Sequence, residues 1–211
     1  MEKSGMIFDG PADGPALVLA HGAGAAMDSP FLNTIAAGLA GGGIRVARFE
    51  FPYMRRRRET GERRPPDREP ALRQAWLDAI ALLGGGESLV IGGKSMGGRM
   101  ASLVADEASV RGLVCLGYPF HPPGQPEKLR TAHLRDLRTQ TLIVQGTRDP
   151  LGTREEVERY DLSPAIRVVW LEDGDHSLKP RVASGHKEKD HLAAAVAAVR
   201  EFVLAQGGGS A

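Results

Sequence analysis

Short, uninterrupted apolar runs alternate along this chain with longer segments of helical periodicity. The runs that have the length and residue types of strands are Ala16–Ala20, Ile44–Phe49, Leu89–Gly92, Gly112–Leu116, Thr141–Gln145 and Val168–Leu171. They are apolar throughout, which is typical of strands that are covered on both faces. The sequence therefore predicts an α/β fold with a mostly parallel sheet of about six to seven strands flanked by helices.

Helical periodicity fills the stretches between and after these runs. The expected helices are Phe31–Leu39, Ala71–Leu83, Met96–Asp106, a short one near Thr131–Leu137, Arg154–Tyr160 and Asp190–Ala205. In the last of them, alanines and valines recur at helical spacing, as in a helix that packs on a sheet. We expect a single domain over residues 1–205 and a flexible tail over residues 206–211.

Composition excludes several classes of protein. The formal net charge of the 211 residues is +1, which argues against general electrostatic binding to nucleic acid. The one cysteine, Cys115, lies in an apolar run and is expected to be a buried small side chain rather than a catalytic thiol. No apolar stretch approaches the ~18 residues of a membrane span, and the N-terminus lacks a secretory signal pattern. We expect a cytoplasmic protein without a membrane span, and the oligomeric state cannot be read from the sequence.

Residues that follow the strands carry the information about function, because ligands of parallel sheets bind beyond the carboxyl ends of the strands. The glycine-rich segment His21-Gly-Ala-Gly-Ala25 follows the first run, Ser95 the third, Asp149 the fifth and His176 the sixth. A glycine-rich loop, a serine, an aspartate and a histidine should therefore meet at one edge of the sheet.

Ser95 is the centre of the pentapeptide Gly93-Lys-Ser-Met-Gly97, which joins an expected strand to an expected helix. A sharp turn of this kind projects the serine outward and needs small residues two places before and after it. The string alone is weak evidence, because 27 of the residues are glycine and an ordinary serine in a glycine-rich turn is the alternative.

A serine hydroxyl needs a neighbouring base to act as a nucleophile, and the base needs an acid that orients it. The order Ser95, Asp149, His176 supplies all three, with His176 as base and Asp149 as acid. About one βαβ unit separates Asp149 from His176, which places both at the edge that carries Ser95. Asp173 and Asp175 are alternative acids, although they lie close in sequence to His176.

Two backbone N–H groups would stabilise the negative oxygen that forms when the serine attacks. The N–H of Met96, at the start of a helix, is one candidate. The other comes from Ala23 or Gly24, where the glycines let the backbone approach without obstruction.

The motifs H-G-A-G, G-K-S-M-G-G-R, G-T-R-D and G-D-H, in this order, resemble the α/β-hydrolase fold over about Ala16 to Ala205. In detail the chain is similar to small uncapped hydrolases of the dienelactone-hydrolase-like subgroup, which Phe51-Pro-Tyr-Met54 and Gly117-Tyr-Pro-Phe-His121 also resemble. The resemblance implies a nucleophile, base, acid and oxyanion hole at Ser95, His176, Asp149 and at Ala23 with Met96. No metal or organic cofactor is expected.

The chain departs from that family in three respects. Dienelactone hydrolases proper have a cysteine where this chain has Ser95. The first two strands of the full fold are missing or reduced to Met6–Asp9. The stretch between Gly117 and Gln140, where many relatives insert a lid, is short. We therefore expect an open, shallow site without a substantial cap domain, which argues against large lipid substrates.

Residues 55–68 contain seven arginines and are expected to form a loop near the active-site edge. The loop is either simply solvated or attracts a carboxylate or phosphate group of the substrate. It lacks the interleaved aromatic residues of a nucleic-acid site. Together with this loop, the candidates for lining the substrate are His21, Tyr53, Arg55 and Tyr118.

Three other readings of the motifs are weaker. A phosphate-binding P-loop would need a glycine where Ser88 stands, and a dinucleotide site would need one where Met27 stands. His186 and His191 could bind a metal with Asp190, but their spacing does not place both histidines on one helical face. We expect them to be solvated.

The sequence thus predicts a serine hydrolase that cleaves a small ester or thioester, either neutral or anionic, through an acyl-enzyme intermediate. The alternative is a binding or scaffold protein that has the same fold and little catalysis.

Overall fold

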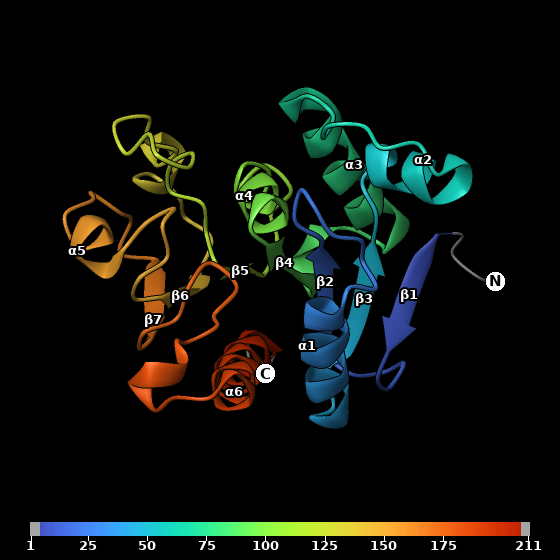
Figure 1. Ribbon diagram of the computed structural model, residues 1–211. Helices are drawn as coiled ribbons and strands as arrows, with labels where there is room; N and C mark the ends of the chain where they lie inside the picture. Colours follow the sequence, from blue (N-terminus) through green and yellow to red (C-terminus); the bar gives the residue numbers. More distant parts are fainter. Residues whose placement is uncertain (1–4, 208–211) are drawn as a thin grey trace.

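The computed structural model describes residues 5–207 and contains one seven-stranded sheet in the order β1-β3-β2-β4-β5-β6-β7. The strands are β1 (Met6–Asp9), β2 (Ala16–Ala20), β3 (Arg45–Phe49), β4 (Leu89–Lys94), β5 (Gly112–Leu116), β6 (Thr141–Gly146) and β7 (Ile166–Leu171). All neighbours pair in parallel except β1, which is antiparallel to β3 at the edge of the sheet. The predicted α/β architecture is confirmed, and Met6–Asp9 is the short edge strand (Figure 1).

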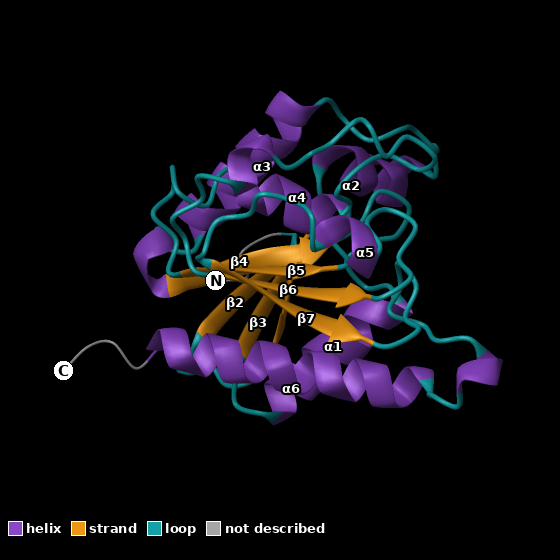
Figure 2. Ribbon diagram, turned by 90° about the vertical axis from the view of Figure 1, so that its left-hand side faces the viewer, coloured by secondary structure: helices purple, strands orange, loops and turns teal. Residues whose placement is uncertain are grey.

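Helices cover both faces of the sheet (Figure 2). The α-helices are α1 (Pro30–Gly41), α2 (Pro52–Thr60), α3 (Glu69–Leu82), α4 (Met96–Ser102), α5 (Arg154–Val157) and α6 (Glu188–Gly207). Three single 3₁₀ turns lie at Gly86–Ser88, Ala132–Leu134 and Val182–Ser184. Helices α1 and α6 lie on one face, and α2 to α5 lie on the other. The strands between them are covered on both sides, as their apolar runs indicate.

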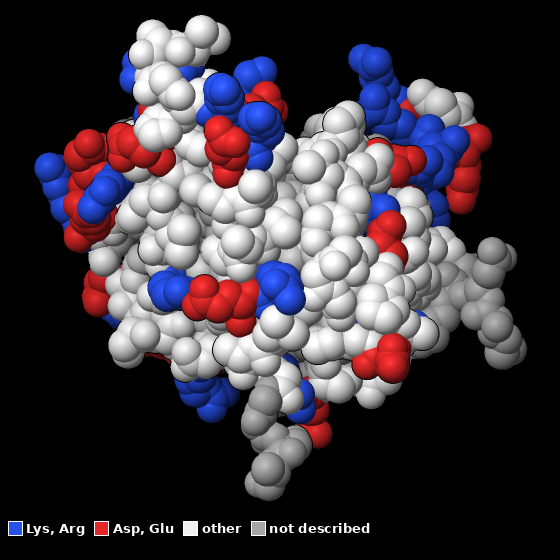
Figure 3. Space-filling view, turned by 90° about the horizontal axis from the view of Figure 1, so that it is seen from below, with Lys and Arg blue, Asp and Glu red and all other residues white. Residues whose placement is uncertain are grey.

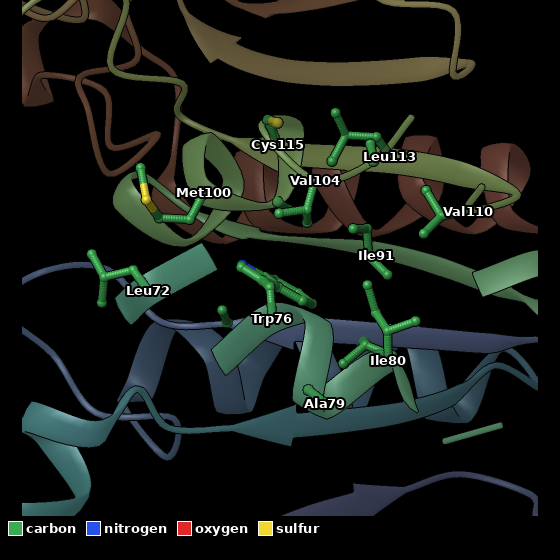
Figure 4. Packing of buried hydrophobic residues seen from close by; sticks show 14 of the residues in the cluster. Leu72, Trp76, Ala79, Ile80, Ile91, Met100, Val104, Val110, Leu113 and Cys115 are labelled. Carbon is green, nitrogen blue, oxygen red and sulfur yellow. The ribbon is translucent and has the colours of Figure 1, made fainter. Parts of the chain in front are cut away.

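The core beneath α3 and α4 supports the strand that ends at Ser95. Trp76 of α3 is fully buried against Ile91 of β4 and Val104 (Figure 4). The Trp76 indole N–H also donates a hydrogen bond to the carbonyl of Gly97, 3.2 Å away, in the first turn of α4. Cys115 belongs to the same cluster, and its burial confirms the prediction of a small core side chain.

The opposite face packs α1 and α6 on the sheet. Leu32, Ile35 and Leu39 of α1 and Val199 and Phe202 of α6 are buried in this second core cluster. Seen from this side, the surface is largely uncharged at its centre, apart from a short row of acidic and basic side chains (Figure 3). This face therefore has no extended basic surface of the kind that binds nucleic acid.

The prediction that residues 55–68 form a loop is wrong for residues 55–60, which are helical, whereas residues 61–68 contain neither helix nor strand. Residues Pro52–Thr60 form α2, with Pro52 in the first turn and Gly61 ending the helix at a φ of 74°. Proline at the start and a left-handed glycine after the end are typical of helix boundaries. Arginine is itself a good helix former, and Tyr53 and Met54 anchor the helix in the core.

Several helix ends also differ from their predicted positions. Helix α4 ends at Ser102 rather than Asp106, because the Leu103 and Val104 N–H groups bond to carbonyls three residues back instead of four. The expected helix near Thr131–Leu137 is only one 3₁₀ turn. Helix α6 includes residues 206 and 207 of the expected tail, and residues 208–211 lie outside the described part of the chain.

Residues 117–140, between β5 and β6, contain only that 3₁₀ turn, so no cap domain covers the edge of the sheet at this point. Over residues 5–207, none of the helices has the length and apolar character that crossing a membrane requires.

Strands β2 and β4 approach so closely that position 93 has no room for a side chain. Gly93 pairs with Ala20, and a Cβ placed on Gly93 would lie 2.3 Å from the Ala20 carbonyl oxygen. We predict that Gly93→Ala lowers the free energy of unfolding by about 1–3 kcal/mol, since backbone must move to relieve the clash. Denaturant unfolding followed by circular dichroism measures this.

Gly41→Ala is the matched control, because a Cβ on Gly41 would meet nothing within 4 Å and the residue lies in helix α1. Alanine is favoured over glycine in a helix, so this variant should be neutral or slightly stabilised. Equal losses of stability in the two variants would contradict the packing argument.

Candidate active site

The chain turns sharply at Ser95, between β4 and α4. Ser95 has a φ of 52° and a ψ of −118°, a conformation that non-glycine residues rarely adopt. Its N–H donates a hydrogen bond to the Leu116 carbonyl, which ties the turn to β5. A Cβ on Gly97 would lie 2.6 Å from the carbonyl oxygens of both Ala20 and His21. The two glycines of the pentapeptide therefore let the turn pack against the end of β2.

Three residues from separate strand ends meet in one hydrogen-bonded chain. The Ser95 Oγ lies 2.8 Å from His176 Nε2, and His176 Nδ1 lies 2.7 Å from an Asp149 carboxylate oxygen. The Asp149 side chain is fully buried, whereas 24% of the His176 side chain is exposed. The structure thus brings together the serine, histidine and aspartate that the sequence predicts for a triad.

The surroundings of Asp149 fix the direction of these hydrogen bonds. Its carboxylate accepts from the Gln145 side-chain amide and from the Leu151 N–H, each at 2.9 Å. An ionised carboxylate only accepts, so Nδ1 of His176 carries the proton and Nε2 is free to accept from the Ser95 hydroxyl. Sequence reasoning missed Gln145. The available signal was a polar residue at the end of an apolar strand, four places before Asp149.

The loop after β2 places N–H groups near Ser95. Among the described residues, the N–H groups of Ala23, Gly24 and Met96 have no hydrogen-bond partner. The Tyr53 hydroxyl holds this loop by donating to the Ala23 carbonyl at 2.9 Å. Free N–H groups beside a nucleophile can bind a negatively charged oxygen.

The His21 ring forms two hydrogen bonds that hold the same loop against the backbone of Phe51. Its Nδ1 lies 2.7 Å from the Gly22 carbonyl, and its Nε2 accepts from the Phe51 N–H at 3.1 Å. Burial lowers the pKa of His21, although the Gly22 hydrogen bond and the charge of Glu50 oppose this. A neutral ring, protonated at Nδ1, satisfies both partners. His21 and Tyr53 are therefore part of the framework of the loop.

Ser95 lies in the lining of two cavities. The four residues that the sequence predicts to line the substrate are in neither of them, so that prediction is wrong. His21, Tyr53 and Tyr118 are buried in the core, and Arg55 lies on the exposed surface of α2. The larger cavity, of about 600 Å³, contains residues from the loop after β2, from α1 and from α6. Its lining includes Ala23, Phe31, Lys94, Ser95, His176 and Leu192. The smaller cavity, of about 300 Å³, shares Ala23 and Ser95 with it.

Lys94 is a second residue that sequence reasoning missed. Its ammonium donates to the backbone carbonyl of His176 at 2.6 Å and lies 5.7 Å from the centre of the Phe31 ring. Burial lowers the pKa of Lys94 to about 8, against the opposing effects of Asp149 and Asp175. Lys94 thus holds the segment that carries His176. The sequence does not indicate this role, because Lys94 lies within the pentapeptide Gly93–Gly97, whose pattern points only to Ser95 and the two glycines.

A second serine–histidine pair lies away from this chain of residues. The Ser102 Oγ is 2.8 Å from His133 Nε2, but Ser102 is buried and donates to the Arg99 carbonyl. In the described part of the structure, His133 has no hydrogen bond to a carboxylate. The pair therefore lacks the orienting acid of a triad.

The remaining sequence candidates have other partners. The Asp173 carboxylate pairs with Arg181 and does not contact His176. His191 is not solvated as predicted, since it is buried with Nδ1 2.8 Å from the Leu178 carbonyl, whereas His186 is exposed. Within residues 5–207, no group of three histidine, cysteine or acidic side chains is placed to hold a metal ion.

The family model described as "Alpha/beta hydrolase domain" matches residues 13–204. The chain belongs to the α/β-hydrolase family. A rat protein, "Putative protein-lysine deacylase ABHD14B", is 30% identical over 142 residues, which are 65% of this chain. This chain spans 63% of the length of that relative. Membership confirms the predicted α/β-hydrolase family, with a fold similar to that of its small uncapped members.

Solved structures have the same fold as this α/β-hydrolase. A dienelactone hydrolase from Anabaena variabilis superposes with a TM-score of 0.72 at 19% identity, covering 94% of this chain and 91% of the other. A serine hydrolase without a lid from Xanthomonas campestris gives 0.62 at 18% identity, covering 93% and 88%. Est1E from Butyrivibrio proteoclasticus gives 0.68 at 15% identity, covering 95% and 93%. At these identities the likeness shows the fold alone.

The hydrogen bond from Lys94 to the His176 carbonyl generates a prediction about pH. Lys94 is charged below its pKa of about 8 and neutral above it. Because the neutral amine is the weaker donor, kcat/KM should fall as the pH rises through about 8. Lys94→Met should lower kcat/KM about tenfold and remove this step. The pH profile of ester hydrolysis measures both effects.

Lys94→Arg is the control, because the guanidinium stays charged over this range. It should also lack the fall near pH 8 while retaining more activity than Lys94→Met. If kcat/KM of Lys94→Met still falls near pH 8, the fall is caused by another titrating group.

Proposed function

We propose that this chain is a serine hydrolase that cleaves a small ester or thioester through an acyl-enzyme, with Ser95, His176 and Asp149 as its triad. The observation that carries the proposal is a pair of hydrogen bonds. His176 Nε2 lies 2.8 Å from the Ser95 Oγ, and His176 Nδ1 lies 2.7 Å from the Asp149 carboxylate. Ser95 and His176 line a cavity of about 600 Å³, which suits a small substrate.

In the first half of the reaction, His176 Nε2 takes the proton of the Ser95 hydroxyl as Oγ attacks the acyl carbon. The carbonyl oxygen becomes negatively charged and accepts hydrogen bonds from the N–H groups of Met96 and of Ala23 or Gly24. Asp149 stabilises the imidazolium that forms. The intermediate collapses, the bond to the leaving group breaks, and His176 donates the proton to the departing oxygen or sulfur, which leaves as the alcohol or thiol.

In the second half, His176 takes a proton from a water molecule, and the oxygen of that water attacks the acyl-enzyme. The same N–H groups bind the oxyanion again. Collapse releases the carboxylic acid, and Ser95 regains its proton from His176. All groups that this cycle needs come from the chain itself.

The experiment is a screen of p-nitrophenyl esters of graded acyl length and of matched acyl-thioesters. We predict turnover of short-chain members. Ser95→Ala should lower kcat by about 10⁴-fold or more, because it removes the nucleophile. Ser102→Ala, which alters the other serine–histidine pair, should retain activity.

The name of the rat relative concerns acyl groups on lysine, so an acetyl-lysine peptide belongs in the screen. We expect esters and thioesters to react faster than this amide, because an amine is the poorer leaving group. If no ester, thioester or amide is turned over by the folded protein, the hydrolase proposal fails. The alternative, a binding or scaffold protein with the same fold, would then be favoured.

A further inference from the structure

The smaller cavity at Ser95 has a different chemical character from the larger one. Its volume is about 300 Å³, and α3, α4 and the segment after β5 contribute to its walls. It is lined by Ala23, Pro66, Asp67, Glu69, Leu72, Ser95, Met96, Arg99, Met100, Pro119, Arg130 and Leu151. Four of these residues carry a charge. In the larger cavity, two of the lining residues, Lys94 and Glu188, carry a charge.

Three of the four charged side chains already have partners. Arg99 donates to the Glu69 carboxylate at 2.9 Å. Asp67 accepts from the Tyr53 N–H at 2.9 Å, at the start of α2, where the helix dipole favours a negative charge. Arg130 differs from them, because its guanidinium has no hydrogen bond or ion pair with any described residue.

The backbone of Arg130 is held by two hydrogen bonds. Its N–H donates to the Phe120 carbonyl at 2.7 Å, and its own carbonyl accepts from the buried Tyr118 hydroxyl at 2.9 Å. Burial and then the nearby charge of Arg99 lower the pKa of Arg130. Arg130 and Arg99 both line the cavity at Ser95, and their like charges repel each other, whereas the Glu69 carboxylate pairs with Arg99 alone. An anion from outside would relieve this repulsion.

We infer that the small cavity binds a carboxylate on one arm of the substrate through Arg130, with Arg99 beside it, while an apolar arm occupies the larger cavity. The inference rests on the proposed function and names its substrate class, a half-ester or half-thioester with a free carboxylate. A planar guanidinium matches a carboxylate with two parallel hydrogen bonds.

This assignment differs from the expectation based on the arginine run at residues 55–58. Arg58 in that run is already bound, since it pairs with both Glu50 and Asp28. Arg55 is exposed and lines neither cavity at Ser95. Arg55 is therefore a suitable control for the effect of losing one positive charge near the same edge.

The test uses two matched pairs of esters, because either arm of the substrate could enter the small cavity. One pair places the charge on the acyl arm: the p-nitrophenyl monoester of glutaric acid and its methyl ester. The other pair places it on the leaving group: 4-carboxyphenyl butanoate and its methyl ester. Each ester is assayed with the wild type and with Arg130→Gln, Arg130→Lys and Arg55→Gln.

We expect the wild type to favour the charged member of one pair by about tenfold or more in kcat/KM. Arg130→Gln should abolish this preference, because kcat/KM for the charged ester falls to the level of the neutral ester. Arg130→Lys should retain part of it, because the charge remains without the planar fork. Arg55→Gln should keep the full preference.

Two results would overturn the inference while leaving the proposed function intact. The first is hydrolysis of the neutral esters with no preference for the charged member of either pair. The second is a preference that survives in Arg130→Gln. Failure of the proposed function looks different, because then none of the four esters is hydrolysed by the wild type.

Discussion

The close approach of β2 to the turn at Ser95 is the contact on which the rest of the site depends. Gly93 and Gly97 have no room for a Cβ, since each lies against backbone oxygen at the end of β2. The turn holds Ser95 at a φ of 52° and presents its side chain at the edge of the sheet. The same approach brings the loop after β2, with the free N–H groups of Ala23 and Gly24, next to the serine. The proposed nucleophile and the proposed oxyanion donors are thus positioned by one packing contact.

A second close contact, between the ends of β6 and β7, positions the proposed base and the proposed acid. A Cβ on Gly146 would lie 2.2 Å from the Gly174 carbonyl oxygen, and the Arg148 N–H donates to that same oxygen at 3.1 Å. The two loops are therefore held together, which brings Asp149 from one of them against His176 from the other. Gln145 also donates a hydrogen bond to the Asp149 carboxylate, and Lys94 donates one to the His176 backbone carbonyl. Asp149 and His176 are therefore each held by more than one hydrogen bond.

The sequence predicts the parallel sheet well, because strands buried on both faces must be apolar throughout and their carboxyl ends share one edge. Ser95, Asp149 and His176 could therefore be placed together from their order alone. Side chains such as Tyr53 and Tyr118 could not be placed, because an aromatic residue near a strand end can point into the core as readily as into a cavity. Helix α2 was missed because its apolar face is too short to show helical periodicity. The role of Arg130 depends on which arginines lack partners, and that is a property of the folded chain.

We propose that Ser95 is an activated nucleophile, and covalent labelling tests this most directly. A fluorophosphonate reacts with a serine hydroxyl that a neighbouring base activates. Treatment of the folded protein should add one adduct mass, and peptide mapping should place it on Ser95. The adduct should be absent from Ser95→Ala and from protein unfolded before treatment. A folded wild-type protein that remains unlabelled, or that carries the label on another serine such as Ser102, would contradict this account.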